Sequence, residues 1–532
     1  MITGADIIGR ALAQAGCTRA FGIPGGEVLA LMEGLRAAGL GFYLTKHETA
    51  AGFMAEGHWH ATGAPGVLVA TIGPGVANAV NVVANAHQDR VPMIFLTGCV
   101  DRADEETYTH QIFDHQAVLR PIVKGSFRAE KGALAPMLEK ALALALSGQP
   151  GPVHIDVPIS VAEGETSERL SRAPLVPPLG VEPGALARLR AALERAERPL
   201  AIAGVDAVNE GAGPAIQAFC EAQNIPLLTT YKGKGLIDEA HPLCLGGHGL
   251  SPKSDSLTMP LIGQADLILL LGYDPIEMRL GWRDPWHDAQ EVYEIAPVAR
   301  DHGMHWVTET LLSPLAPCLD ALVETPQPQR WDLGAPSAAR DALQAAFAPR
   351  DGFGPGTVFA TLRAAMPPET VVTVDSGAHR ILVSQMWEAP GPRQMLQSTA
   401  LCTMACALPL AAGYKMGAMD LPVLAILGDG GLEMGLGELA TLREHKLPVI
   451  LCVIVDESLT LIEMKQRSGQ RPNLGVDFTG SDFPALAQAM GGYGVWVDDA
   501  ESLAQEAQAA MSRDTFTLLA CRIGPRAYDG TF

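Results

Sequence analysis

Apolar and polar positions along the chain follow a repeating pattern that predicts strands joined by helices. The clearest case is residues 421–458. There an apolar run ends in Gly428-Asp429-Gly430-Gly431, a helical pattern of leucines follows, and a second apolar run ends in Asp456-Glu457-Ser458. Short apolar runs closed by Gly or Asp are typical of buried parallel strands with a crossover helix between them. We therefore expect Asp429 and Asp456 at the same edge of a parallel sheet, where open α/β sheets bind their ligands.

The same alternation of strand and helix patterns extends over the rest of the chain. Helices include one that starts near Thr3 and one at 357–366, and strands are expected at 17–23, 39–44, 66–71, 91–97, 200–204, 225–230, 265–272 and 370–374. A proline-rich stretch at 173–178 and a loose stretch at 325–356 are the expected linkers. The predicted fold class is α/β, with three doubly wound parallel-sheet domains at 1–170, 180–328 and 350–532. The first and third of these should share one architecture.

Composition narrows the class of protein. The 532 residues are too many for one core, and an apolar content of 48% suffices for several. The formal charge of −21 argues against a nucleic-acid or anionic-membrane partner, because both need basic surface. It still allows a phosphorylated ligand whose charge a metal ion balances. No basic region precedes an apolar segment at the N-terminus, and the apolar run 447–455 is too short to span a bilayer.

The nine cysteines are dispersed singly through apolar surroundings. An odd count without paired spacing fits a reduced protein, and we expect a cytoplasmic location. Cys402 and Cys406 stand four residues apart, as neighbours on a helix would. Core packing is the expected role of this pair, rather than metal binding.

Two glycine-rich turns and the aspartate pair each allow more than one interpretation. The turn from Gly73 to Asn78 offers donors at a helix start, but Asn78 stands where a dinucleotide fingerprint has its third glycine, so NAD binding is not expected. The turn Tyr231-Lys232-Gly233-Lys234-Gly235 fits either a nucleotide phosphate site or an exposed basic turn. Asp429 and Asp456 suit a divalent cation that carries phosphate oxygens, or they simply cap helices or turns.

Four motifs in a fixed order give the chain a specific resemblance. They are Phe21-Gly22-Ile23-Pro24-Gly25-Gly26, Lys46-His47-Glu48, Ile72-Gly73-Pro74-Gly75 with Asn78, and Gly428-Asp429-Gly430. Together they resemble thiamine-diphosphate-dependent enzymes of the acetolactate synthase and 2-oxo acid decarboxylase superfamily. The resemblance covers nearly the whole chain, in the order pyrimidine-binding domain, central domain, diphosphate-binding domain.

The resemblance implies roles for individual residues. Glu48 stands where a glutamate binds a ring nitrogen of the cofactor's aminopyrimidine and favours the tautomer that accepts a proton. A carboxylate that stabilises a helix N-terminus is the alternative. Asp429 and Asp456, with a backbone carbonyl near Ser458, would hold a Mg²⁺ ion on the diphosphate. Met404 would support the bent cofactor, although a core methionine on a helix fits the local sequence nearly as well. The implied cofactor contacts are Ile23, Pro24, Gly25, Gly73, Asn78, Gly377, Ala378, His379, Met404, Gly428, Asp429, Gly430, Gly431 and Ile462.

The sequence departs from the family pattern at several positions. Asp456 replaces the usual Asn, and the extra negative charge should still favour a divalent cation. His110 stands where acetolactate synthases usually carry Phe, and Ile159 stands where anabolic members carry Lys. Glu463-Met464-Lys465-Gln466 replaces a tryptophan-containing stretch that selects a second 2-oxo acid. These departures leave the substrate open.

Three features favour acetolactate synthase-like chemistry. They are the Gly25-Gly26 turn, the alignment of Gln111 with a glutamine near the substrate, and the segment Gly272-Tyr273-Asp274-Pro275-Ile276-Glu277. The last resembles flavin-independent members, so we expect that FAD is not required.

The candidate catalytic residues are Glu48, Gln111 and His110. His115 and His379 are further histidines, a residue type suited to acid/base work near neutral pH. A histidine at the surface is the alternative for His110. Glu463 and Lys465 face either a substrate or solvent.

The leading hypothesis is an enzyme that decarboxylates a pyruvate-like 2-oxo acid and joins the remainder to a carbonyl acceptor. The alternatives are a decarboxylase or 2-hydroxyacyl lyase that does not ligate, and a cofactor-binding regulatory protein without catalysis. Glu48 and the aspartate pair argue against the last. In the superfamily the cofactor lies between the first domain of one subunit and the third domain of another. The resemblance therefore implies a homodimer or homotetramer, and the acidic charge leads us to expect no nucleic-acid or membrane partner.

Overall fold

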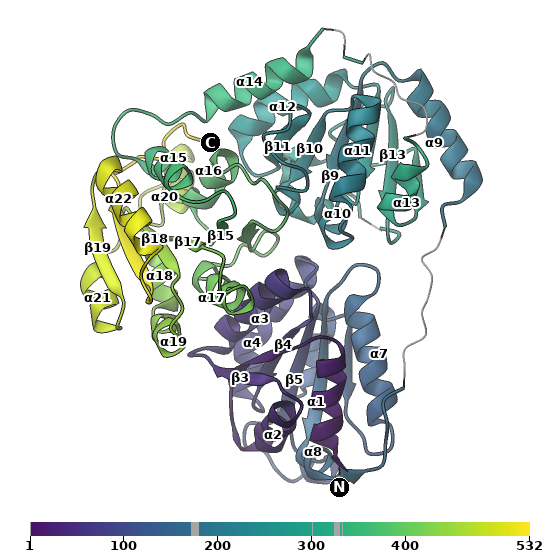
Figure 1. The fold of residues 1–532 in the computed structure, drawn as a ribbon, viewed down its shortest axis with the longest axis vertical. Helices are drawn as coiled ribbons and strands as arrows, with labels where there is room; N and C mark the ends of the chain where they lie inside the picture. Colours follow the sequence, from purple (N-terminus) through teal and green to yellow (C-terminus); the bar gives the residue numbers. More distant parts are fainter. Residues whose placement is uncertain (1, 172–179, 301, 324–329, 332) are drawn as a thin grey trace.

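Three six-stranded parallel sheets form the frame of the molecule (Figure 1). The computed structural model describes residues 2–171, 180–300, 302–323, 330–331 and 333–532. The proline-rich linker expected at 173–178 lies outside the described residues. Hydrophobic clusters lie on both faces of each sheet, where helices cover it. The predicted α/β class with three doubly wound parallel sheets is therefore confirmed.

The first sheet has the strand order β3-β2-β4-β5-β7-β6. α1 (Gly4–Gln14), α2 (Leu29–Ala37) and α7 (Leu134–Leu146) pack on one face, and α3 (Glu48–Thr62) and α4 (Pro74–Gln88) pack on the other. Thr3 forms a capping box with Asp6, so α1 begins where the sequence predicts. A short antiparallel pair joins β1 (Ile2–Thr3) to β8 (Glu165–Thr166). The strands of the sheet are β2 Arg19–Ile23, β3 Gly41–Leu44, β4 Gly66–Ala70, β5 Met93–Cys99, β6 Gly125–Arg128 and β7 Pro152–Pro158.

The second sheet has the strand order β11-β10-β9-β12-β13-β14. β9 (Pro199–Ala203), β10 (Leu227–Thr230) and β12 (Leu267–Leu271) lie where the apolar runs predict strands. The other strands were not predicted, because a Gly-Gly pair interrupts one run and glutamates interrupt or shorten the other two. They are β11 Cys244–His248, β13 Glu291–Ala296 and β14 Glu309–Leu312. The covering helices are α9 Pro183–Arg195, α11 Gly213–Gln223, α12 Pro252–Gln264 and α13 Leu315–Asp320.

The expectation of a loose linker at 325–356 is wrong over part of its length. The described part contains a helix, α14 (Ala335–Ala346), which packs beside α12. Its sequence, APSAARDALQAA, is rich in alanine, the strongest helix former, and that propensity outweighs the single proline near the helix start.

The third sheet has the strand order β16-β15-β17-β18-β20-β19. The crossover between β17 and β18 consists of two helices, α18 (Asp429–Gly435) and α19 (Glu438–Glu444), rather than one. The strands are β15 Val371–Val374, β16 Met395–Gln397, β17 Val423–Gly428, β18 Ile450–Val455, β19 Tyr493–Val497 and β20 Thr517–Arg522. The other covering helices are α15 Pro355–Ala365, α16 Ala378–Met386, α17 Ala407–Gly417, α21 Phe483–Ala489 and α22 Ala500–Ala510.

The first and third domains share one hydrophobic core, in which α3 lies against α17 (Figure 1). The two helices cross with their backbones almost in contact. A Cβ on Gly57 would lie 2.2 Å from the carbonyl oxygen of Leu410, and a Cβ on Gly413 would lie 2.0 Å from that of Met54. Glycine at both crossing points therefore sets how closely the two domains approach.

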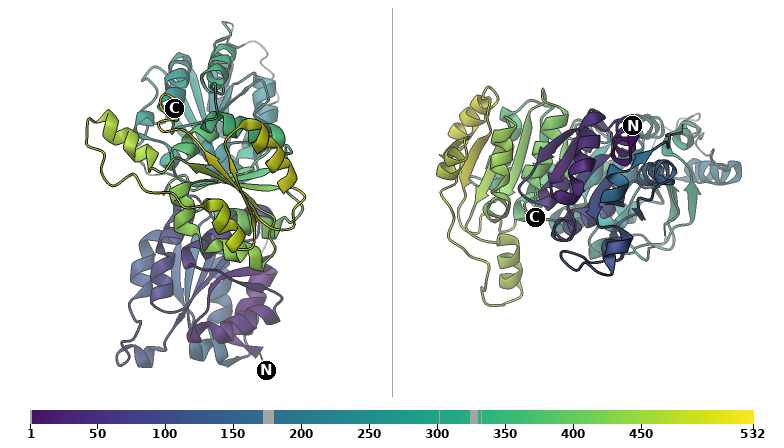
Figure 2. Two further views of the ribbon diagram at one scale, coloured as in Figure 1. Left: turned by 90° about the vertical axis from the view of Figure 1, so that its left-hand side faces the viewer. Right: turned by 90° about the horizontal axis from the view of Figure 1, so that it is seen from below.

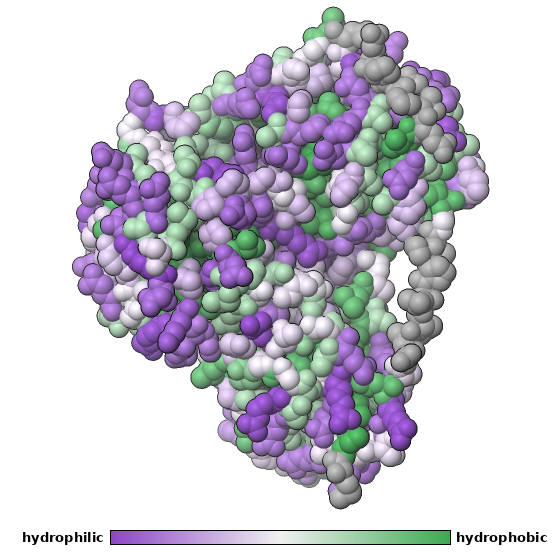
Figure 3. All heavy atoms as spheres, viewed as in Figure 1, coloured by the Kyte–Doolittle hydropathy of each residue, from purple (hydrophilic) through white to green (hydrophobic). Residues whose placement is uncertain are grey.

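One helix of the third domain is only partly covered by the described residues. α20 (Thr460–Ser468) and the loop after it stand away from the third sheet (Figure 2), and none of the helix residues is buried. On the face drawn in Figure 3, polar and apolar side chains are interspersed. Every helix in the described ranges is too short or too polar to cross a bilayer.

Candidate active site

A cavity of about 190 Å³ opens at the carboxyl edge of the third sheet. β17 and β18 run parallel, with Gly428 opposite Ile454, and so they deliver Asp429 and Asp456 to this edge. Both side chains line the cavity. Other sequence-predicted residues in its wall are Gly377, Ala378, His379, Met404, Gly428, Gly430, Gly431, Ser458 and Ile462.

Backbone N–H groups hold the Asp429 carboxylate in place. Its Oδ2 accepts hydrogen bonds from the N–H groups of Glu457 at 2.7 Å and Asp456 at 3.1 Å, and its Oδ1 accepts one from Gly430 at 2.8 Å. Glu457 has a left-handed backbone, with φ of 55°, at the bend that aims these successive N–H groups at Asp429. Burial nevertheless raises the pKa of Asp429 above its ordinary value.

Asp456 supplies a second buried carboxylate, whose Oδ2 accepts a hydrogen bond from the Thr460 hydroxyl. Burial raises the pKa of Asp456 to about 6, and the neighbouring charge of Asp429 adds to this effect. The Ser458 hydroxyl donates to Asp477 at 2.8 Å, and the backbone carbonyl of Ser458 accepts from Thr460 Oγ1 at 3.5 Å. Two carboxylates that are costly to ionise alone, beside a carbonyl oxygen, fit a hard divalent cation such as Mg²⁺.

Backbone donors for a diphosphate lie at the start of α16. Gly377 precedes this helix without any side-chain cap, so the first N–H groups of the helix have no partner within it. The ring of His379, in the first turn, hydrogen-bonds through Nε2 to Asp375 Oδ1 at 2.7 Å. At Gly431 a Cβ would lie 2.0 Å from Asp375 Oδ2, so a larger residue does not fit there. The donors and the small residues together fit a diphosphate group.

Met404 lies in a turn and not on a helix, so the alternative of a core methionine on a helix is wrong. Its side chain lines the Asp429 cavity and also a neighbouring cavity of about 660 Å³. His47, Thr49 and Glu438 line the second cavity. Ile462 contributes an apolar wall from the exposed helix α20.

Glu48 is the first residue of α3, and only 5% of its surface is exposed. Asn78 Nδ2 donates to Glu48 Oε2 at 2.9 Å, and Thr49 Oγ1 donates to the Asn78 carbonyl at 2.6 Å. These bonds join the start of α3 to the first turns of α4. A Cβ on Gly75 would lie 3.3 Å from Glu48 Oε1, so glycine at this position keeps space beside the carboxylate.

Ile23 ends β2, and Pro24 and Gly25 follow it at the carboxyl edge of the first sheet, where a Cβ on Gly25 would lie 2.0 Å from Thr71 Oγ1. Gly73, which precedes α4, has a φ of 64° and lies directly against Gln111. A Cβ on Gly73 would lie 2.2 Å from the Gln111 carbonyl oxygen. His110 is exposed and meets the ring of Tyr108 at 6.3 Å.

The two predicted halves of the site are not brought together within one chain. Among the described residues that line the Asp429 cavity, Glu48, Gln111 and His110 are absent. The first-domain residues cluster at one sheet edge, and the metal and diphosphate residues cluster at another.

Three interpretations from the sequence are wrong. Lys232 and Lys234 form neither an exposed turn nor a free phosphate site, because Lys232 pairs with Asp89 at 2.8 Å and Lys234 with Glu239 at 2.7 Å, and both lysines are buried. Cys402 lies in a loop and Cys406 is the N-cap of α17, so the two are not helix neighbours.

Two residues that shape the site were not predicted. Glu438 Oε1 accepts hydrogen bonds from the N–H groups of Lys46 at 2.8 Å and His47 at 3.2 Å, just before Glu48. No local pattern marks Glu438, since its partners are nearly four hundred residues away in sequence. Asp375, like Asp429, directly follows an apolar strand, and that signal could have identified it.

Comparison with protein families gives three matches, each described as a domain of thiamine pyrophosphate enzymes. The N-terminal TPP binding domain matches residues 2–118, the central domain matches residues 186–322, and the C-terminal TPP binding domain matches residues 375–521. The matches follow the order of the three sheets.

Individual relatives are similar over nearly the whole chain. The acetolactate synthase large subunit of Parasynechococcus marenigrum (strain WH8102) is 31% identical, over 97% of this chain and 87% of that protein. The probable 2-ketoarginine decarboxylase AruI of Pseudomonas aeruginosa is 30% identical, over 98% of this chain and 94% of that protein. The acetolactate synthase of Bacillus subtilis (strain 168) is 26% identical, over 96% and 91%.

Proposed function

The chain belongs to the thiamine pyrophosphate enzymes, as an acetolactate synthase-like member, and from this premise we propose that it decarboxylates a pyruvate-like 2-oxo acid and joins the remainder to a carbonyl acceptor. Membership makes it a thiamine-diphosphate-dependent enzyme that acts on carbon–carbon bonds. The observation that carries the finer proposal is Glu48, buried at the start of α3 and held by Asn78. This buried carboxylate, together with the aspartate pair, argues against a cofactor-binding protein without catalysis.

The residues of the first domain position and tune the cofactor. When bound, thiamine diphosphate supplies a nucleophilic carbon that adds to the 2-oxo group and accommodates the electron pair left by departing CO₂. Glu48 would hold a proton shared with the aminopyrimidine, because Asn78 fixes Oε2 and Gly75 leaves space beside Oε1. Gln111 would orient the substrate from the segment that touches Gly73, and His110 would serve as a proton donor or acceptor.

The residues of the third domain would hold the diphosphate and a Mg²⁺ ion. Asp429, Asp456 and the Ser458 carbonyl are hard oxygen ligands, and both carboxylates are stabilised in their ionised form when a cation binds between them. The start of α16 would donate to phosphate oxygens, as helix N-termini commonly do.

The active unit would be a homodimer or a tetramer built from such dimers. Glu48 does not line the Asp429 cavity of its own chain, which supports a site shared between two subunits. α20 has no buried residue although it carries Ile462 at the cavity, so a partner subunit would cover it.

The central domain would work without FAD. Ligands of open α/β sheets bind at the carboxyl ends of the strands, and buried ion pairs fill that edge of the second sheet. Arg300 pairs with Asp206 and, at 3.1 Å, with Glu294. Arg90 of the first domain donates to Asp274 at 2.9 Å, on the same edge. A flavin would have to displace these pairs.

The nine free cysteines, most of them buried, support a reducing compartment, and we propose the cytoplasm. A second candidate function is decarboxylation or 2-hydroxyacyl cleavage without ligation. The similarity to a protein named as a 2-ketoarginine decarboxylase, at 30% identity, favours it.

Incubation of the purified protein with thiamine diphosphate, Mg²⁺ and a panel of 2-oxo acids, with mass spectrometry of all products, separates the two candidates. Acetolactate from pyruvate is the expected product, whereas acetaldehyde alone would establish decarboxylation without ligation. An absorption spectrum of the same sample should lack flavin bands, and bound FAD would contradict the proposal for the central domain.

Replacing Glu48 by Gln should reduce turnover of every 2-oxo acid by about 100-fold or more, because the amide cannot share the proton. Thiamine diphosphate should still bind, since the metal and diphosphate residues are unchanged. Full turnover by the Glu48→Gln variant would exclude the proposed mechanism.

A further inference from the structure

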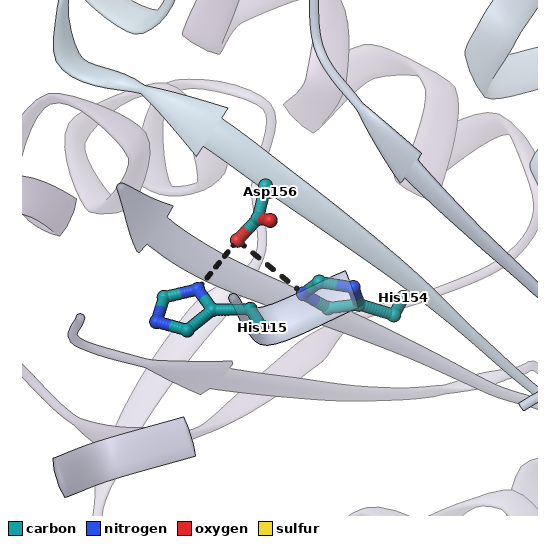
Figure 4. Close-up of side chains that lie close together, drawn as sticks. All are labelled: His115, His154 and Asp156. Atoms are coloured by element: carbon teal, nitrogen blue, oxygen red, sulfur yellow. Dashed lines mark hydrogen bonds and ion pairs between the residues drawn. The ribbon is translucent and has the colours of Figure 1, made fainter. Parts of the chain in front are cut away.

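Three buried polar side chains, His115, His154 and Asp156, lie close together in the first domain (Figure 4). Asp156 and His154 are on β7, and His115 begins the short helix α6 (His115–Leu119). Asp156 Oδ1 lies 2.8 Å from His115 Nδ1, and it accepts a hydrogen bond from Thr97 Oγ1 at 2.7 Å. His115 and Asp156 are each 4% exposed, and His154 is fully buried.

The other ring nitrogen of His115 shows where the proton lies. The backbone N–H of Gly73 donates to His115 Nε2 at 3.2 Å. A backbone N–H can only donate, so Nε2 carries no hydrogen and the proton of the neutral ring sits on Nδ1, which faces Asp156. Burial opposes ionisation of Asp156, but hydrogen bonds with His115 and His154 outweigh it and lower the pKa of that carboxyl. An ionised Asp156 therefore fixes the tautomer of His115.

The hydrogen bond from the Gly73 N–H to His115 Nε2 also argues against a metal ion in this cluster. The ligand atoms of His115, His154 and Asp156 lie within 4.8 Å of one another, a spacing that a metal ion could bridge. A metal on His115 Nδ1 would need that nitrogen without its proton and Nε2 as a donor. Nε2 instead faces a donor, and Thr97 Oγ1 already lies 2.8 Å from His154 Nε2. The cluster is complete as a hydrogen-bond network.

Gly73 is the point where this network meets the first-domain half of the active site. It precedes α4, whose Asn78 holds Glu48, and its missing side chain lets the Gln111 carbonyl pack against it. Its φ of 64° is one that larger residues rarely adopt. The N–H of Gly73 has no partner within α4, so His115 supplies the hydrogen bond that sets the orientation of the turn.

We propose that His115 is a positioning residue of this enzyme. With its tautomer fixed by Asp156, it holds the Gly73 turn and so keeps Glu48 with Asn78, and the Gln111 segment, in the arrangement that catalysis needs. The role in catalysis rests on the proposed function, whereas the hold on the turn can be measured without it.

Three variants separate this role from simple loss of a buried side chain. In His115→Gln the side-chain oxygen can still accept from Gly73, near the position of Nε2. In His115→Asn the amide can still donate to Asp156, near the position of Nδ1, but it does not reach Gly73. His154→Asn is the matched control, because it removes an equally buried imidazole from the same cluster without touching Gly73.

The first measurement is amide hydrogen exchange of cofactor-free protein, followed by mass spectrometry of peptides that cover residues 71–80. His115→Asn should speed exchange in this segment by about 10-fold or more, while His115→Gln and His154→Asn should leave it close to wild type. Equal protection in His115→Asn and wild type would overturn the proposal, whatever reaction the enzyme performs.

The second measurement is turnover of the 2-oxo acid identified from the panel. His115→Asn should lower kcat by about 10- to 100-fold, as expected for a small misplacement of catalytic groups, with His115→Gln near wild type. Equal losses in His115→Asn and His154→Asn would show a merely structural role. Stoichiometric zinc in the purified protein, absent from His115→Asn, would replace the positioning role with a metal site.

Discussion

At the scale of single residues, the proposed metal site includes a carboxylate, Asp456, at a position where the family pattern usually has asparagine. Asp456 shares its cavity with Asp429, and burial raises the pKa of both. A cation between them would offset the cost of ionising two buried acids. Asparagine at the same position would offer one neutral oxygen to the metal and avoid the repulsion.

Replacing Asp456 by Ala should therefore weaken Mg²⁺-dependent binding of thiamine diphosphate by more than about 100-fold, because one ligand is lost from the ion. Titration calorimetry of the cofactor with and without Mg²⁺ measures this. Asp456→Asn is the control and should retain binding. Unchanged affinity in Asp456→Ala would place the metal elsewhere.

A second residue makes stability depend on pH. Glu277 accepts a hydrogen bond from the Lys232 N–H at 2.9 Å, and burial raises its pKa to about 8. The folded protein therefore keeps a proton that the unfolded chain releases near its ordinary value. The stability contributed by this proton is fully present at low pH and is lost as pH rises from about 5 to about 8.

The melting temperature of the wild type should fall over this pH range more steeply than that of Glu277→Gln, whose amide does not ionise. Thermal unfolding followed by circular dichroism at several pH values checks the difference between the two slopes. Parallel slopes would show that Glu277 is ionised in the folded protein.

At the scale of elements, the crossing of α3 and α17 links the first and third domains. Replacing Gly413 by Ala would place a methyl group 2.0 Å from the Met54 carbonyl oxygen, so one helix must move. We expect a loss of about 1–3 kcal/mol in unfolding free energy, measured by thermal or denaturant unfolding. Gly281→Ala is the control, because no atom lies within 4 Å of a Cβ there. A stable Gly413→Ala protein would show that the crossing can relax.

Strands that are uniformly apolar could be predicted from the sequence, because burial on both faces leaves an unbroken run, as in β12 and β18. β13 escaped prediction because two glutamates interrupt its run, and one of them, Glu294, is neutralised by Arg300 from outside the strand. The start of α1 could also be predicted from local sequence, since Thr3 and Asp6 stand three residues apart and form a helix cap.

The candidate site also contains some features that local sequence predicts and others that depend on distant parts of the chain. Asp429 and Asp456 follow strands directly, and Glu48 follows β3 after a short turn, so their place at a sheet edge could be predicted from nearby sequence. The partners that hold them could not. Asp156 lies 41 residues from His115, and Glu438 lies 391 residues from His47, and only the folded sheets bring each pair together.

At the scale of the whole molecule, each chain carries the two halves of the proposed site at separate places. A dimer would then combine Glu48 of one chain with Asp429 and Asp456 of the other. Mixed dimers of two inactive variants test this arrangement, because each site takes one half from each subunit.

Coexpression of Glu48→Gln and Asp456→Ala chains should give mixed dimers with about half of wild-type activity, since each mixed dimer has one intact site of two. Turnover of the isolated mixed dimers, purified through two different tags, measures this. The two variants mixed after purification, without subunit exchange, are the control. No recovery in the mixed dimers would mean that each site lies within one chain.

The buried polar contacts between domains have a consequence for how the protein melts. Lys232 of the second domain pairs with Asp89 of the first, and Asp89 also accepts hydrogen bonds from the N–H groups of Thr399 and Ala400 of the third. The Asp89 carboxylate thus contacts all three domains. Separating any one domain from the others would remove the ion pair of Asp89 with Lys232, its hydrogen bonds with the third domain, or both. A scanning calorimeter should accordingly record a single endotherm, the domains unfolding together as one cooperative unit.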